Sequence, residues 1–347
     1  MLLNGMRIPL ELRRRFLMGG LSRREYEQYK ADAKKRIWDF KRRHSLKKTD
    51  PDPDKQEYQP VPGFPNLLSL NIAEELEDRV NDPESINQKD SSLCGAASVM
   101  FCWLRKRPDL YVQYVINVCE TGVGKMGDLL VTPKAGCRYY NNKRPDGKLA
   151  ISAVDWIALA ALRDSENGHM RYDSADDQVA GITMPSKIAK WFKNIGYYVT
   201  GNETNLLFNK GFSALREAAA HLKYRESVCL FINANVISEA KDRGQNVTPN
   251  HWVVMMSEPM IDGQSIFTFP DAAGLDKKTI NFKIFTWGGV SYIKNLYKQT
   301  VTVKEFLSCF RGFISAEYPS SPSSFEFKVF SWWIQHHGYN HNHLLGW

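Results

Sequence analysis

The sequence predicts an α+β protein in which helices come first and an antiparallel sheet follows. Helical patterns dominate from about residue 66 to residue 222. From residue 227 onward the period changes to short apolar runs of strand length, and Asp262-Gly263 forms a hairpin turn between two of them. Helices and strands that occupy separate blocks of the sequence are typical of the α+β class.

Start and stop signals delimit the predicted elements. Ser22 and Glu25 form a capping box at the start of a charged helix that stops near His44, and Ser152 with Asp155 opens a second helix in the same way. Further helices are predicted at Leu93–Leu104, Pro185–Phe192, Phe212–Leu222 and Val301–Phe310. Strands are predicted at Ser227–Ile237, His251–Ile261, Ser265–Phe269, Thr279–Trp287 and Gly312–Ala316.

The positive charge of the chain is concentrated near its N-terminus. Residues 1–48 contain 15 Lys and Arg against 5 Asp and Glu, so they carry +10, whereas the whole chain carries +8. Prolines crowd residues 49–65, which excludes a helix or a central strand and predicts a linker. We therefore predict a basic helical arm (1–48), a proline-rich linker (49–65), a folded domain (66–320) and an aromatic, histidine-rich tail (321–347).

Several classes of protein do not fit this composition. No apolar run approaches the roughly 20 residues that span a bilayer, and the N-terminus lacks the pattern of a secretory signal. We expect synthesis in the cytoplasm and, if the protein is secreted, a signal-independent route. The arm contains no nucleic-acid-binding motif, so we favour docking to a partner over binding of nucleic acid.

Cysteine and histidine spacing gives no metal or redox site. The six cysteines contain no C-x-x-C pair, and we expect most of them to be reduced and structural. Four histidines gather in the tail, but no Cys or carboxylate ligand accompanies them, so we expect neither a metal ion nor a cofactor. These four are His336, His337, His341 and His343.

Cys94 is the candidate nucleophile. It lies in the first turn of the predicted helix Leu93–Leu104, where unpaired N–H groups and the helix dipole favour the thiolate. Gly95 and two alanines leave room for a substrate carbonyl. His251, at the start of a predicted strand, is the candidate base, since imidazole can accept the thiol proton and later protonate the leaving group.

These residues together resemble the papain-like cysteine peptidases. Gln88 lies six residues before Cys94, the spacing that this family uses for an oxyanion-hole glutamine. Cys94-Gly95-Ala96 is similar to the opening of the family signature, whereas Ala97 and Ser98 depart from its last two positions. The order of a helix with Cys and then a sheet with His also matches. The resemblance covers roughly residues 85–320 and implies a papain-like α+β catalytic domain.

The family also has a third residue that orients the histidine. Our candidate is Asp271, because a turn at Asp262-Gly263 would return the chain beside His251 and place Asp271 opposite Val254. The alternative for Asp271 is an ordinary turn residue after a proline. Asn250 and Asn281 are lesser candidates for the same role.

The resemblance implies acyl transfer. Cys94 would attack a carbonyl, the Cys94 N–H and the Gln88 side chain would hold the oxyanion, and His251 would move the proton. By analogy with bacterial toxins and effectors that carry papain-like domains, the expected substrate is an amide in a protein or in peptidoglycan, with a delivery partner or inhibitor protein. Two alternatives stay open: a thiol-dependent deamidase or acyltransferase, and a non-catalytic binding protein with a basic docking arm.

Overall fold

The structure is a computed structural model that describes residues 21–44, 59–144, 146–167, 173–174, 183–237, 250–293 and 300–319. It also describes the backbone of two short paired strands, β1 (Leu2–Leu3) and β2 (Met6–Arg7). The predicted tail (321–347) and most of the predicted linker lie outside the described residues.

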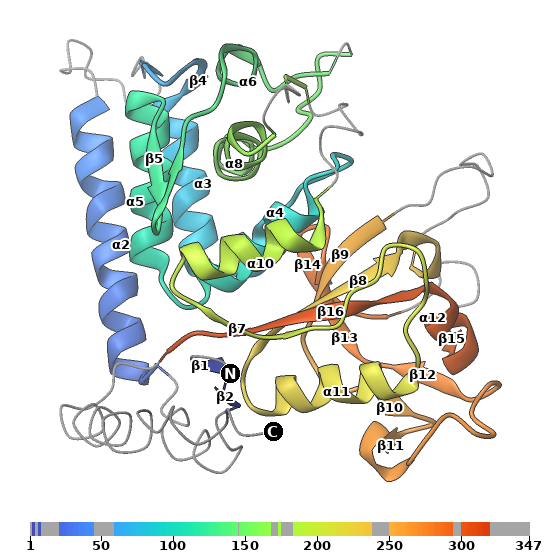
Figure 1. The fold of residues 1–347 in the computed structure, drawn as a ribbon. Coiled ribbons are helices and arrows are strands. Elements are labelled where there is room, and N and C mark those ends of the chain that lie inside the picture. The colour runs from blue at the N-terminus through green and yellow to red at the C-terminus, as the bar shows by residue number, and fades with distance from the viewer. Residues whose placement is uncertain are drawn as a thin grey trace, which may run out of the picture.

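A helical part comes first, as predicted, and gathers several helices side by side (Figure 1). Two hairpins accompany it, β3 (Pro60–Val61) with β4 (Phe64–Leu68) and β5 (Gly124–Met126) with β6 (Leu129–Val131). The helices are α2 (Arg23–His44), α3 (Ser69–Asn81), η2 (Pro83–Ser85), α4 (Cys94–Leu104), α5 (Pro108–Thr121), α6 (Ala135–Tyr139), α7 (Ala153–Asp155), the π-helix η3 (Trp156–Ala160), α8 (Ala161–Ser165) and α10 (Pro185–Asn194).

Helix α2 begins at the capping box that the sequence predicts. The Ser22 Oγ accepts the N–H of Glu25 at 3.2 Å, and the Glu25 carboxylate accepts the N–H of Ser22 at 2.9 Å. Its apolar stripe of Ala33, Ile37 and Phe40 is fully buried, and α2 packs against α3 and α5. The described part of the predicted arm is therefore packed into the core of the domain, which differs from the separate arm that its charge and the prolines suggested.

The second part is a six-stranded antiparallel sheet with the order β14-β13-β9-β8-β16-β7. Together with the helices it confirms the predicted α+β class. The strands are β7 (Tyr198–Asn202), β8 (Ser227–Asn233), β9 (Asn250–Met255), β13 (Lys283–Thr286), β14 (Gly289–Tyr292) and β16 (Phe310–Glu317).

A smaller four-stranded sheet has the order β11-β10-β12-β15. The predicted hairpin at Asp262-Gly263 is confirmed, since both residues have positive φ and join β10 to β11. This sheet comprises β10 (Met260–Ile261), β11 (Gln264–Ser265), β12 (Thr279–Asn281) and β15 (Val301–Thr302), with the nearby short helices η4 (Ala234–Val236), η5 (Ile266–Thr268) and α12 (Val303–Cys309).

Helices cover both faces of the six-stranded sheet. In Figure 1, α4 and α10 lie on one side of it, and α11 (Phe212–Lys223) lies on the other. The strands alternate accordingly: Trp252 and Val254 of β9 belong to the core shared with α4, whereas Val253 and Met255 belong to the core shared with α11. The N-terminus of α4 and the start of β9 are thereby brought together.

Candidate active site

Cys94 is the first residue of α4, and its thiol is enclosed by backbone N–H groups. Those of Trp252, Gly95 and Cys94 itself lie close enough to the sulfur to lower its pKa. No side chain caps this helix end, so its first N–H groups are not engaged by a capping side chain. The Trp252 contact comes from the strand β9, and it places the sulfur against the residue that follows His251 in the chain.

Burial controls the protonation of Cys94. The residue is only 6% exposed, and burial raises its pKa to about 11, although the three N–H groups and the positive charge of Arg163 act in the opposite direction. The helix N-terminus alone predicted a thiolate. In the structure the loss of water outweighs it, and Cys94 is a neutral thiol at pH 7.

His251 is held at the start of β9 by two neighbours. Its Nε2 forms a hydrogen bond with Thr286 Oγ1 at 2.8 Å, and its ring stacks on the ring of Trp287 at 4.7 Å between centroids. Burial lowers the pKa of His251 to about 4, so the ring is neutral at pH 7. Within the described residues, no hydrogen bond joins the ring to the Cys94 thiol.

Thr286, and not Asp271, makes the hydrogen bond to the His251 ring. The strand beside β9 is β13, with Phe285 opposite Val254, so the predicted register, with Asp271 at that place, is wrong. The physical reason is that the chain after the Asp262-Gly263 turn builds the smaller sheet. Asp271 is exposed there and accepts the N–H of Ala273 at 2.8 Å, the turn contact of the alternative interpretation.

The two lesser candidates lie in different strands. Asn281 is an exposed residue of β12 in the smaller sheet. Asn250 begins β9, where its backbone pairs with that of Asn233 on β8. The orienting residue was missed because sequence order did not show which strand lies beside β9.

Gln88 is buried in the loop before Cys94. Its Nε2 donates to the carbonyl of Ser91 at 3.0 Å, and Ser91 donates its hydroxyl and its N–H back to the Gln88 carbonyl. The loop is thus closed on itself just ahead of α4. A primary amide has two N–H hydrogens, so Nε2 retains one donor beyond the contact with Ser91.

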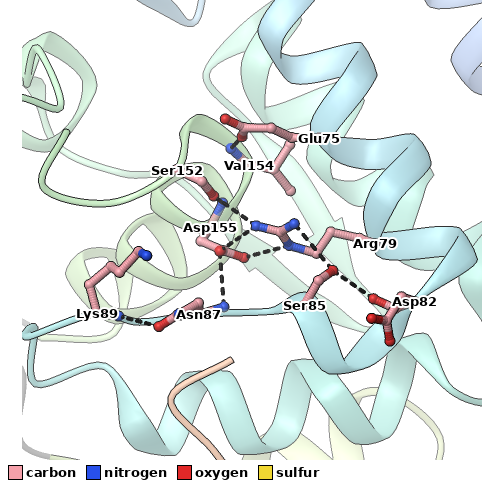
Figure 2. A network of polar contacts seen from close by, with 9 residues as sticks. All are labelled: Glu75, Arg79, Asp82, Ser85, Asn87, Lys89, Ser152, Val154 and Asp155. Atoms are coloured by element: carbon pink, nitrogen blue, oxygen red, sulfur yellow. Dashed lines mark hydrogen bonds and ion pairs between the residues drawn. The ribbon is translucent and has the colours of Figure 1, made fainter. Parts of the chain in front are cut away.

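A buried ion pair fixes this loop to the helical part (Figure 2). Arg79 donates Nε and Nη2 to the two carboxylate oxygens of Asp155 at 3.2 and 2.7 Å. The same carboxylate accepts the N–H of Asn87 at 3.0 Å, and Asn87 precedes Gln88. The sequence showed Asp155 only as a residue of a helix start, and nothing in the pattern indicated its partner Arg79.

The loop also contacts the turn beside His251. A Cβ atom added to Gly288 would lie 2.4 Å from Asn87 Nδ2, so the Asn87 side chain packs directly on the turn that carries Trp287. Gly288 has φ +79°, a conformation that favours glycine. The Gln88 loop and the His251 side of the site therefore meet at this contact.

Thr183 covers the other side of the helix start. A Cβ atom on Gly95 would lie 2.5 Å from the Thr183 Cβ, and the Thr183 carbonyl accepts the indole N–H of Trp252 at 2.9 Å. This close approach accounts for the glycine after Cys94 more directly than room for a substrate does. Arg163 and Thr183 are two residues near Cys94 that sequence reasoning missed.

The described residues contain no group of three or more His, Cys, Asp or Glu that could hold a metal ion. All six cysteines are unpaired in this part of the chain. None of the described helices combines the length and apolarity needed to cross a membrane. The four tail histidines lie outside the described residues.

No protein-family model, curated protein or solved structure matches this chain.

Proposed function

We propose that the protein is a papain-like cysteine hydrolase that cleaves an amide bond, with Cys94 as nucleophile and His251 as base. One observation carries the proposal: the start of α4 meets β9 beside His251, where Gly95 packs on Thr183 and the Thr183 carbonyl accepts the indole N–H of Trp252 at 2.9 Å. Cys94 at a helix start and His251 at a strand start thus belong to two elements that pack against each other. An imidazole bonded to a hydroxyl through Nε2 keeps Nδ1 for proton transfer.

The mechanism begins with two neutral groups. His251 accepts the proton of Cys94 as the sulfur attacks the carbonyl, so the ion pair forms during the reaction and not before it. The backbone N–H groups at the start of α4 and the remaining Nε2 hydrogen of Gln88 stabilise the oxyanion. The charge of Arg163 favours the thiolate. His251 then protonates the leaving amine, and water releases the acyl group from the sulfur.

A non-catalytic protein is the second candidate, and the burial of the two side chains favours it. Cys94 is 6% and His251 is 5% exposed, so a substrate must displace part of the cover to reach them. A thiol with a pKa of about 11 and an imidazole with a pKa of about 4 are also what two structural core residues would show. The two candidates differ in whether Cys94 can be acylated.

Acylation by p-nitrophenyl acetate tests the proposal on the native chain. We expect a burst of p-nitrophenolate and an acetyl group that mass spectrometry locates on Cys94, and neither in Cys94→Ala. Cys309→Ala is the matched control, because Cys309 is the least buried cysteine and the main competitor for the reagent. Acetylation that stays in Cys94→Ala and disappears in Cys309→Ala would leave the non-catalytic candidate.

Variants of the base and the oxyanion donor extend this test. His251→Ala should slow acylation about 100- to 10,000-fold, and Gln88→Ala about 100- to 1,000-fold. The double variant of Cys94 and His251 should be no worse than Cys94→Ala, because residues that act as a unit are not additive. With a protein substrate, new amino termini indicate a peptidase, and released ammonia indicates a deamidase.

A further inference from the structure

A second pocket lies at the opposite ends of the two elements that carry Cys94 and His251. Its volume is about 280 Å³, just below the range of about 300–1,000 Å³ that is usual for drug-sized ligands. The walls come from the end of α4, the turn between α11 and β8, and the last residues of β9. A pocket of this size suits a small ligand.

Three cations surround this pocket. Arg105 and Lys106 follow the end of α4, and Arg225 follows α11. Within the described part of the chain, no carboxylate lies at ion-pair distance from any of them. Arg105 instead contacts Met256 Sδ at 3.6 Å and the face of the Phe101 ring at 5.2 Å.

The one carboxylate in the lining is already engaged. Glu226 is 5% exposed, and its Oε2 contacts His221 Nδ1 at 2.8 Å and accepts the hydroxyl of Thr200. The lining therefore holds three cationic side chains against one carboxylate. Burial, followed by the charges of Arg105 and Arg225, lowers the pKa of Lys106, while Cys102 and Glu317 act in the opposite direction.

Arg225 occupies a backbone position that usually belongs to glycine. Its φ is +62°, and its N–H donates to the Leu222 carbonyl at 2.8 Å while the next N–H, of Glu226, donates to the His221 carbonyl at 3.3 Å. This is the Schellman arrangement at a helix end, with Arg225 at the left-handed residue. A non-glycine residue is strained in this conformation, and such strain concentrates at functional sites.

We propose that this pocket binds a phosphate group, either as inorganic phosphate or as the phosphomonoester of a small molecule. Two guanidinium groups, one ammonium group and the hydroxyl of Ser227 in the lining supply more donors than a single carboxylate can accept. A phosphate carries a charge of about −1.5 to −2 at pH 7 and offers three or more acceptor oxygens. The pocket is a binding site separate from Cys94, so this proposal does not depend on catalysis.

Thermal unfolding of the full chain in increasing sodium phosphate tests the site. We expect the melting temperature to rise with phosphate beyond the rise in sodium chloride of equal ionic strength. In Lys106→Met and Arg225→Gly, the phosphate concentration at half-maximal shift should increase at least tenfold. Lys223→Ala is the matched control, because Lys223 ends α11 beside the pocket without lining it, and its titration should stay within twofold of the native chain.

Arg225→Gly separates binding from folding. Glycine adopts the left-handed conformation at position 225 without strain, so the melting temperature of this variant in chloride should be no lower than that of the native chain. Its melting temperature should no longer respond to phosphate. As a second readout, phosphate should slow the acetylation of Lys106 by acetic anhydride, followed by mass spectrometry. Titration with phenyl phosphate distinguishes the sources: tighter binding than phosphate indicates a phosphomonoester, and weaker binding indicates the free anion.

Two results would contradict the proposal of a phosphate site. One is an equal rise in melting temperature in phosphate and in chloride, which would mean that the cations are merely screened. The other is an unchanged phosphate titration in both Lys106→Met and Arg225→Gly.

Discussion

His251 is held through its Nε2 by the hydroxyl of Thr286, 2.8 Å away on the neighbouring strand β13. A hydroxyl can accept the Nε2 hydrogen and so fix the tautomer and the angle of the ring, which carboxylates and amides do in other histidine sites. It carries no negative charge, however, and therefore does not stabilise an imidazolium as a carboxylate would. This agrees with the neutral ring and its pKa of about 4.

Thr286→Val should slow the acylation of Cys94 by p-nitrophenyl acetate. The change removes only the hydrogen bond, because valine has nearly the same shape. A hydrogen bond of this kind contributes about 0.5–1.5 kcal/mol, so we expect a loss of rate of about two- to thirteenfold. Thr286→Ser is the control that keeps the hydroxyl, and it should restore the native rate. Equal rates in the valine and serine variants would show that Thr286 does not orient the ring.

The pKa of His251 predicts an acid-dependent loss of stability. The usual value of 6.5 falls to about 4 in the folded state, so between these pH values the unfolded chain binds a proton that the folded chain does not. The contribution of the neutral His251 ring to the free energy of unfolding is complete above pH 6.5. It is lost as the pH falls to 4, and the total loss is roughly 3 kcal/mol. Urea unfolding of His251→Gln should therefore show a shallower decrease than the native chain over this range.

The raised pKa of the Cys94 thiol predicts a loss of stability at alkaline pH. Its folded pKa of about 11 lies above the ordinary value of 9, so its contribution is complete below pH 9 and is lost as the pH rises to 11. Cys94→Ala should flatten the alkaline decrease and keep the acid decrease, and His251→Gln should do the reverse. If both variants follow the native profile at both ends, the two groups titrate in the folded protein as they do in water.

Elements defined by local sequence were predictable, whereas pairings between distant segments were not. The capping box at Ser22 and the turn at Asp262-Gly263 depend on residues a few positions apart, and the structure confirms both. Which strand pairs with β9 depends on the path of the whole chain. The local hairpin at Asp262-Gly263 predicted the wrong neighbour, because β13 and not the strand after that turn pairs with β9. A single sequence contains little information on such non-local register.

The same distinction applies to the candidate site. Cys94 and His251 were selected by residue type and by their places at a helix start and a strand start. The structure has a helix that begins at Cys94 and a strand that contains His251, but the predicted strand His251–Ile261 is divided into β9 and β10, which belong to different sheets. Burial is a property of the assembled core, so the sequence indicated a thiolate where the structure gives a neutral thiol. The partnership of Arg79 and Asp155 spans 76 positions and left no local pattern.

Asp155→Ala should destabilise the domain and reduce acylation of Cys94. It leaves the buried Arg79 without a counterion, a change that costs about 3–5 kcal/mol, and it frees the N–H of Asn87 ahead of Gln88. Glu77→Ala is the matched control, since Glu77 pairs with Lys41 at the surface and such pairs contribute about 0–1 kcal/mol. Similar urea midpoints for the two variants would mean that the buried pair does not secure the loop.

Helix α2 offers a pair of neighbouring aromatic residues with which to test whether the basic segment belongs to the fold. Phe40 is fully buried in the core, and Trp38 is 55% exposed two residues earlier. Phe40→Ala should cost about 3–5 kcal/mol of unfolding free energy, whereas Trp38→Ala removes mainly the contact of its ring with Arg42 and should cost less than about 1 kcal/mol. Removal of residues 1–58 should then abolish cooperative unfolding, because it uncovers the faces of α3 and α5 that α2 buries. The opposite result would be a soluble fragment from residue 59 that unfolds cooperatively, together with equal effects of the two substitutions. It would support the separate arm that the charge distribution suggested.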